Sequence, residues 1–165
     1  MIYKLQKNLE NKSLANVVFI FCAIQLVVII FLSVVVSNVD PSLTEIDWLN
    51  DLSLFDIFLL SVIVVPLVET CIFQFFIIES TFLFIENSSW AEKIALILSS
   101  ILFGLSHYYN IYYIVIMIFI GLFYCWIYIF IRNWKSRKSA FWSLTLIHAT
   151  NNLFAFIVDD VLKLS

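Results

Sequence analysis

The chain has 165 residues, of which 63% are hydrophobic and only 13% are charged. Its mean hydropathy of +1.03 excludes a soluble globular domain, and nothing in the charge pattern indicates nucleic-acid binding. The net charge of -3 matters less than where the charges lie along the sequence. We therefore expect an all-α integral membrane protein, a single transmembrane domain over residues 1–165, with about five to six transmembrane helices in the lipid bilayer and a polar intramembrane cavity.

The first apolar stretch, Leu14 to Ser37, carries no charge and is long enough for one membrane span. It is too long, and too poorly followed by small residues, to be a cleaved signal peptide, so residues 14–37 are predicted to form an N-terminal anchor helix. The second stretch, Leu52 to Ile85, exceeds the roughly 20 residues of one straight span. It must tilt, kink or break, and Pro66 is the expected position because proline removes an intrahelical hydrogen bond.

Three further apolar stretches follow, joined by short linkers: Ile94 to His107, Ile111 to Ile131 and Ala140 to Val158. Each is long enough, or nearly so, to cross a bilayer. The sequence therefore predicts five crossings, and a re-entrant piece near Pro66 would have to return to its own side to preserve them.

Basic residues gather in two places, which the positive-inside rule assigns to the cytoplasm. One group precedes the first span and the other fills the loop before the last: Lys4, Lys7 and Lys12, then Arg132, Lys135, Arg137 and Lys138. The loop at 38–51 holds only acidic charges and is predicted to be external. The N-terminus is thus predicted to be cytoplasmic. A bias towards Ile, Phe and Asn is typical of an AT-rich genome and favours a bacterial plasma membrane.

Four polar side chains inside the apolar stretches are candidates for chemistry: Glu69, His107, His148 and Asn152. An ionisable group in hydrocarbon costs about 2.5 to 3.5 kcal/mol, so such residues usually have a function. His148 and Asn152 are four residues apart, share a helix face, and could hold a developing oxyanion. Glu69 and His107 could share a water whose proton the glutamate takes. These groups suffice to hydrolyse a peptide bond within the membrane.

Structural interpretations compete for the remaining polar residues. A single buried histidine in a membrane helix is as often an interhelical hydrogen-bond partner as a catalytic group, whereas two histidines with a glutamate favour function. Gln25, Asn110 and Asn151 are interpreted as interhelical hydrogen-bonding groups. Two interpretations of Glu79 remain: it simply lies near the cytoplasmic face, or it has a functional role.

Three motifs lie in order on consecutive apolar segments of the chain. The second motif is Ser99-Ser-Ile-Leu-Phe-Gly-Leu-Ser-His107 with Asn110, and the third is His148-Ala-Thr-Asn-Asn-Leu-Phe-Ala155 after Gly121-Leu-Phe. The first is Pro66-Leu-Val-Glu69 followed by Phe73. Together these motifs resemble those of the CAAX protease and bacteriocin-processing (CPBP) family of intramembrane endopeptidases, which includes the type II CAAX prenyl endopeptidases. The resemblance covers about residues 55–158, and three such patterns in order are far more specific than one.

The resemblance implies a helical membrane protease in which Glu69 and His107 activate a water while His148 and Asn152 stabilise the oxyanion. It implies a peptide or protein substrate within the membrane, such as a prenylated C-terminal peptide or a small prepeptide. No cofactor is expected. A zinc ion held by Glu69, His107 and His148 is possible in principle, but the metal-free glutamate mechanism is favoured.

The first motif departs from the family, which usually reads Glu-Glu-x-x-x-Arg. Thr70 and Gln74 stand where the second glutamate and the arginine are usual. A joint change avoids the about 3 to 5 kcal/mol cost of leaving one buried charge unpaired. It is compatible with the fold and with Glu69, yet it keeps a second hypothesis open: a non-catalytic relative acting as a bacteriocin-immunity or regulatory binding factor.

Overall fold

The computed structural model describes residues 7–39 and 52–162, and within these ranges the chain is helical and contains no strand. Five helical units are long and apolar enough to span a membrane, which confirms the predicted fold class. In chain order the elements are α2 (Leu14–Val39), α3 (Leu54–Ile57), α4 (Val65–Glu69), α5 (Ile77–Phe84), α6 (Ser88–Leu105), α7 (Ile111–Trp134) and α8 (Arg137–Ala155). The acidic loop predicted to be external lies, from residue 40 to residue 51, outside the described residues.

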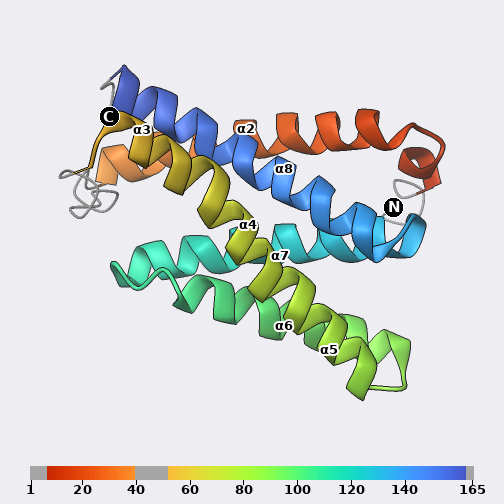
Figure 1. Cartoon of the computed structure of the whole chain (residues 1–165). Coiled ribbons are helices and arrows are strands. Elements are labelled where there is room, and N and C mark those ends of the chain that lie inside the picture. The colour runs from red at the N-terminus through yellow and green to blue at the C-terminus, as the bar shows by residue number, and fades with distance from the viewer. Residues whose placement is uncertain (1–6, 40–51, 163–165) are drawn as a thin grey trace.

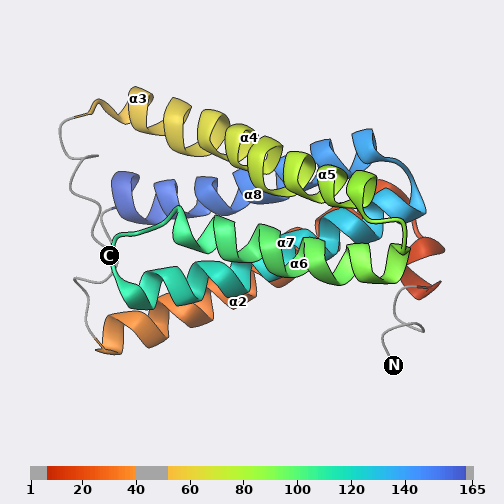
Figure 2. The same ribbon diagram turned by 90° about the horizontal axis from the view of Figure 1, so that it is seen from below.

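The five spans alternate in direction (Figure 1). The N-terminal end, the turn between α5 and α6 and the turn between α7 and α8 lie at one end of the bundle, while the turn between α6 and α7 and the C-terminal end lie at the other (Figure 2). Five alternating spans thus bring the basic loop 132–138 to the same end as the start of α2, as the charge pattern predicts.

The second span is an unbroken helical rod from Leu54 to Phe84, 31 residues long. At 1.5 Å per residue it reaches about 46 Å, well beyond the roughly 30 Å of hydrocarbon. It crosses the other helices diagonally, so tilt takes up the excess length (Figure 1). The chain does not break at Pro66. Instead π-helical segments, Phe58–Val64 and Thr70–Phe76, flank the short helix α4 that contains the proline.

Helix α7 is the central span, with the largest share of buried residues among the five. It packs against α6 at a close approach made possible by the two glycines of the chain. A Cβ on Gly104 would lie 2.9 Å from the backbone nitrogen of Ile118, and one on Gly121 would lie 3.1 Å from Cα of Ser100. Small residues allow helix backbones in a membrane to pack this tightly. The α6–α7 pair thereby fixes the position of His107, which follows Gly104 by three residues.

Two helices begin earlier than predicted. Helix α6 starts at Ser88 instead of Ile94, with the Asn87 side chain accepting a hydrogen bond from the Trp90 backbone N–H, and α8 starts at Arg137 instead of Ala140, with Ser136 in the same role. Hydrophobicity marked the membrane-buried part of each helix. The polar first turns, which side-chain caps stabilise, extend beyond it.

Candidate active site

Three of the four predicted residues meet between the second, third and fifth spans. The Glu69 carboxylate lies between two imidazoles, with Oε1 3.5 Å from His107 Nε2 and Oε2 3.6 Å from His148 Nε2. The side chains are 18%, 14% and 6% exposed, respectively. Both distances are longer than a normal hydrogen bond. At this separation one water can bond to the carboxylate and an imidazole at the same time. The structure therefore brings together one carboxylate and two imidazoles in a largely buried cluster. The first and last of these residues, Glu69 and His148, are 79 positions apart in the sequence.

The backbone around Glu69 is irregular on both sides. Glu69 is the last residue of α4, between the two π-helical segments. Pro66 has no N–H to donate, and the N–H of Val65 bonds to the carbonyl of Leu60 five residues earlier. Such π-helical turns recur at functional sites in helical proteins. Pro66 thus perturbs the span as predicted, but by widening the helix instead of breaking it.

The α6–α7 turn orients His107. Its Nδ1 lies 2.8 Å from the backbone carbonyl of Phe103. A carbonyl only accepts hydrogen bonds, so Nδ1 carries the hydrogen and donates it. The other nitrogen, Nε2, then presents its lone pair towards Glu69. The four-residue spacing between Phe103 and His107 therefore fixes the tautomer as well as the position of the ring.

His148 is held differently. It is 4% exposed, and its Nδ1 has no hydrogen-bond partner in the described part of the chain. Its ring instead packs against two aromatic rings, 4.8 Å from Tyr124 and 6.1 Å from Phe103 between centroids. The Phe103 ring also lies 4.8 Å from that of His107. Sequence reasoning missed Tyr124, because nothing in a run of aromatic and aliphatic residues distinguishes this tyrosine from its neighbours.

Asn152 lies one turn beyond His148 on α8, as the spacing predicted. Its amide Nδ2 donates to the backbone carbonyl of Ser61, 2.8 Å away in the first π-helical segment. Its Oδ1 accepts from the neighbouring Asn151 amide at 3.2 Å. Asn152 thus ties α8 to the span that carries Glu69. A carboxamide has a second N–H, which this contact leaves for another acceptor.

Thr70 and Gln74 are fully buried directly after Glu69. They belong to a buried stripe at four-residue spacing that starts at Val62, passes through Pro66 and ends at Ile78. The Thr70 hydroxyl and both amide atoms of Gln74 have no hydrogen-bond partner among the described residues. Buried polar atoms are usually paired, so this concentration next to Glu69 is unusual.

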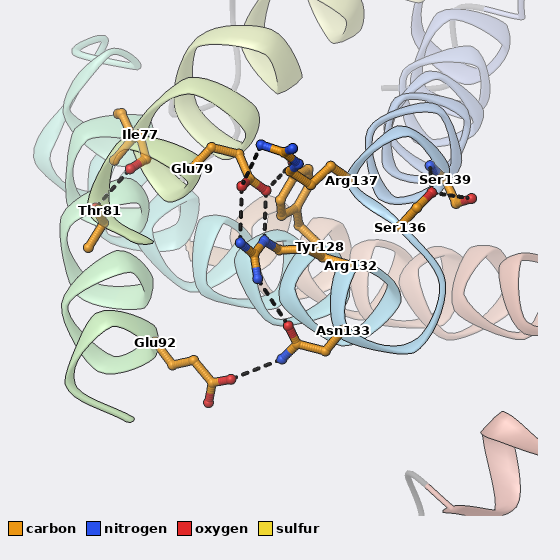
Figure 3. Close-up of polar contacts among 10 residues, drawn as sticks. All are labelled: Ile77, Glu79, Thr81, Glu92, Tyr128, Arg132, Asn133, Ser136, Arg137 and Ser139. Atoms are coloured by element: carbon orange, nitrogen blue, oxygen red, sulfur yellow. Dashed lines mark hydrogen bonds and ion pairs between the residues drawn. The ribbon is translucent and has the colours of Figure 1, made fainter. Parts of the chain in front are cut away.

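Glu79, which the sequence left open, sits in a second polar cluster (Figure 3). Its carboxylate accepts hydrogen bonds from Arg132 Nε at 2.7 Å and Nη2 at 3.1 Å, and from the Tyr128 hydroxyl at 3.0 Å. Arg137 adds an ion pair at 3.8 Å. These contacts join α5, α7 and α8 at the end of the bundle that carries the basic loop. Of the three residues interpreted as interhelical hydrogen-bonding groups, Gln25 bonds across helices to Tyr124, Asn110 caps the start of α7, and Asn151 donates to Asn152 on its own helix.

Across residues 7–39 and 52–162, no group of three or more His, Cys, Asp or Glu side chains is arranged to hold a metal ion. Of the possible zinc ligands, Glu69 lies between His107 and His148, and each imidazole Nε2 faces one of its carboxylate oxygens. This arrangement suits proton exchange among the three groups.

Together the fold and the cluster define an all-helical membrane protein with a buried carboxylate–imidazole site. The sequence profile of the family described as type II CAAX prenyl endopeptidase Rce1-like matches residues 51–154. The chain belongs to this family, which assigns it to the CAAX-type intramembrane proteases. No curated protein matches the chain, and no solved structure does. The matched segment contains all four candidate residues and begins after α2.

Proposed function

We propose that this protein hydrolyses a peptide bond within the membrane, with Glu69 as the general base. In the proposed reaction Glu69 takes a proton from a water that His107 also contacts, and the hydroxide attacks the carbonyl carbon of the scissile bond. The observation that carries this proposal is the Glu69 carboxylate lying 3.5 and 3.6 Å from the two imidazole Nε2 atoms. A buried carboxylate between two imidazoles is equipped to accept a proton and pass it on.

His148 and the free N–H of Asn152 are proposed to stabilise the oxyanion that forms on the carbonyl oxygen. Removing one such donor typically costs about 10²- to 10³-fold in turnover. The proton held by Glu69 then moves to the leaving nitrogen, the C–N bond breaks, and the products are a carboxylate and an amine. Support comes from the one-turn spacing of His148 and Asn152 on α8, and from the bond between Asn152 and Ser61, which holds this face of α8 against the Glu69 span.

The proposed substrate is a small membrane-embedded peptide, either a prenylated C-terminal peptide or a prepeptide precursor. The apolar outer surface supports a substrate that arrives through the bilayer, since large side chains such as Phe19, Leu83 and Phe84 are 74%, 79% and 81% exposed. An apolar surface of this kind favours a membrane-embedded substrate over a water-soluble one. We propose that the chemistry needs no metal, since Glu69 can supply the proton transfer by itself.

The test is cleavage of internally quenched peptides, one prenylated and one unmodified prepeptide, by the purified full chain. Wild type is compared with Glu69→Gln and His107→Ala, each with and without chelator. We expect cleavage that both substitutions abolish and that chelator leaves intact. Glu79→Gln is the matched control, because it makes the same chemical change on the same helical rod. Cleavage by Glu69→Gln at the wild-type rate would refute the glutamate mechanism, and loss with chelator alone would assign a metal.

A second candidate function is that of a non-catalytic binding factor for a membrane peptide. The burial of Thr70 and Gln74 without partners favours it, because both stand where the family usually has charged residues. The family match offers no support for a bacteriocin-immunity role in particular. If wild type cleaves neither peptide and the Thr70→Glu/Gln74→Arg double variant does, the chain is a binding relative.

We further propose that the N-terminus faces the cytoplasm of a bacterial plasma membrane. Support comes from the charge distribution: the turn between α7 and α8, where the sequence has Arg132, Lys135, Arg137 and Lys138, lies at the same end of the bundle as the start of α2 (Figure 1). Reporter fusions after residues 12 and 135 should both report the cytoplasmic side, and a periplasmic signal from either would overturn the orientation.

A further inference from the structure

The first span, α2, carries one strongly polar residue in the middle of its length. Gln25 is only 2% exposed, and it is flanked by apolar residues on both sides. A carboxamide in a hydrocarbon setting must find a partner or bear the cost of desolvation. Its Nε2 donates to the Tyr124 hydroxyl at 2.5 Å, across an interface between segments 99 residues apart.

Tyr124 connects this bond to the candidate active site. Its side chain is 1% exposed, and its ring lies 4.8 Å from the His148 ring at an interplanar angle of 45°. The same ring packs edge-on against Phe103, at 5.8 Å between centroids. Phe103 in turn contacts both imidazoles. Tyr124 therefore forms one wall of the pocket in which His148 sits.

The two histidines differ in what orients them. A backbone carbonyl holds Nδ1 of His107, whereas Nδ1 of His148 has no hydrogen-bond partner in the described ranges. An imidazole without such an anchor is oriented by the rings it packs against and by the group facing its other nitrogen. For His148 these are Tyr124, Phe103 and the Glu69 carboxylate. The tilt of Tyr124 thus bears directly on where His148 Nε2 points.

Other contacts hold α2 in place at this level. Helix α2 also packs against α8, the helix that carries His148. Phe21 packs edge-on against three aromatic rings of α7, at 5.7 to 6.3 Å. Helix α2 lies outside the segment that the family profile matches, which begins at residue 51.

We propose that Gln25 is a positioning residue: it acts through Tyr124 on the His148 imidazole and makes α2 part of the functional unit. Its effect on catalysis rests on the proposed function, but its effect on His148 does not. Because the chain contains only two histidines, each imidazole can be observed separately.

The experiment uses the full chain with ¹⁵N-labelled histidine in detergent micelles, and it records the imidazole nitrogen signals, with His107→Gln assigning the two rings. Gln25→Leu removes the amide, and Tyr124→Phe keeps the ring but removes the hydroxyl. We expect both variants to shift the His148 signals and to leave those of His107 in place. The double variant should shift them no further than the larger single change, because the two residues act as one unit.

Phe21→Leu is the matched control, since it weakens the packing of α2 on α7 without touching the hydrogen bond. It should lower stability and leave the His148 signals unchanged. Unchanged His148 signals in Tyr124→Phe and Gln25→Leu, or an equal shift in Phe21→Leu, would overturn the proposal. Tyr124→Phe keeps the test decisive if Gln25→Leu does not fold, because it preserves the packed ring.

Kinetics on the prenylated peptide give the second readout. We expect Gln25→Leu to lower kcat by roughly 10- to 100-fold, the range caused by small misplacement of a reacting group, with KM unchanged. If the wild type cleaves no peptide while the His148 signals still shift, the proposed function fails and the positioning contact stands. If Gln25→Leu and Tyr124→Phe cleave the peptide normally and their His148 signals do not shift, the positioning proposal fails while the proposed function stands.

Discussion

Two glutamates on one helical rod differ in how their largely buried carboxylates are paired. Glu79 is 12% exposed, and it is met by two arginines and a tyrosine hydroxyl at distances from 2.7 to 3.8 Å. Glu69, ten residues earlier, is 18% exposed and faces two imidazoles at 3.5 and 3.6 Å. Its Oε2 has no hydrogen-bond partner in the described part of the chain.

The difference agrees with the roles proposed for the two charges, structural for Glu79 and catalytic for Glu69. Arg132 holds the Glu79 carboxylate with two hydrogen bonds and stacks over the Phe82 ring at 3.9 Å, which joins the second and fourth spans. Around Glu69, unpartnered atoms accumulate on Thr70, Gln74 and His148 instead. Buried polar groups without partners lower stability, and natural proteins keep such groups mainly at sites where activity needs them. We infer that the Glu79 cluster stabilises the bundle, while the Glu69 cluster costs stability.

The largest expected difference between the two glutamates is in activity, which should depend on Glu69 and not on Glu79. Glu69→Gln should reduce peptide cleavage by roughly 10²- to 10⁴-fold, the usual contribution of a general base. Glu79→Gln should stay within about tenfold of wild type, since ten residues of helix place it roughly 15 Å away. Initial rates on the quenched peptides measure both. Equal losses in the two variants would erase the distinction between the clusters.

Stability should show the reverse order. Glu79→Leu leaves Arg132 unpaired and should cost about 3 kcal/mol, at the low end for breaking a buried pair because Arg132 is 21% exposed. Glu69→Leu should change stability by less than about 1 kcal/mol, or raise it, because it removes a poorly satisfied carboxylate. The free energy of unfolding in mixed detergent–SDS micelles provides the comparison. A Glu69→Leu loss as large as that of Glu79→Leu would contradict it.

The two buried glutamines give a matched pair at smaller scale. Gln74→Leu should stabilise the protein by about 1 to 2 kcal/mol, because it removes two buried polar atoms that have no partner. Gln25→Leu should destabilise it by a similar amount, since it leaves the Tyr124 hydroxyl without its donor. Both are read from the same SDS titrations. A loss of stability in Gln74→Leu would mean that its amide atoms are satisfied after all.

The smallest effect concerns the rim of the Glu79 cluster. Arg137 is 68% exposed, and its nitrogen lies 3.8 Å from the carboxylate. Exposed pairs contribute little, so Arg137→Ala should cost less than about 1 kcal/mol and should cost less still at high salt. Titrations at two salt concentrations test this. A cost matching that of Glu79→Leu would place Arg137 among the core contacts of the cluster.

Much of the fold followed from local rules. Five apolar runs joined by short linkers predicted five crossings, and the described residues contain five helical units that could span a membrane. The ends of α6 and α8 were missed, although Asn87 and Ser136 are the kind of capping residue that marks a helix start. At Pro66 the sequence predicted a disturbance but not its form, because tilt, break and π-helical widening all accommodate a missing N–H.

For the site, sequence reasoning selected Glu69, His107, His148 and Asn152 because charged and amide groups are rare in hydrocarbon. The spacing of His148 and Asn152 also placed these two on one helix face. The sequence did not predict which atoms of these residues face one another. The Glu69 contacts, the bond from Asn152 to Ser61 and the wall formed by Tyr124 all join residues from different spans.

The sequence by itself determined the membrane-embedded helical class, a range of five to six spans and the residues worth testing, because hydropathy and helical periodicity act within short windows of chain. Only the tertiary structure decided that Glu79 is satisfied and Glu69 is not, that Thr70 and Gln74 turn inward without partners, and that Gln25 reaches Tyr124. These outcomes depend on how five helices pack side by side, and contacts between distant segments leave no local pattern in the sequence.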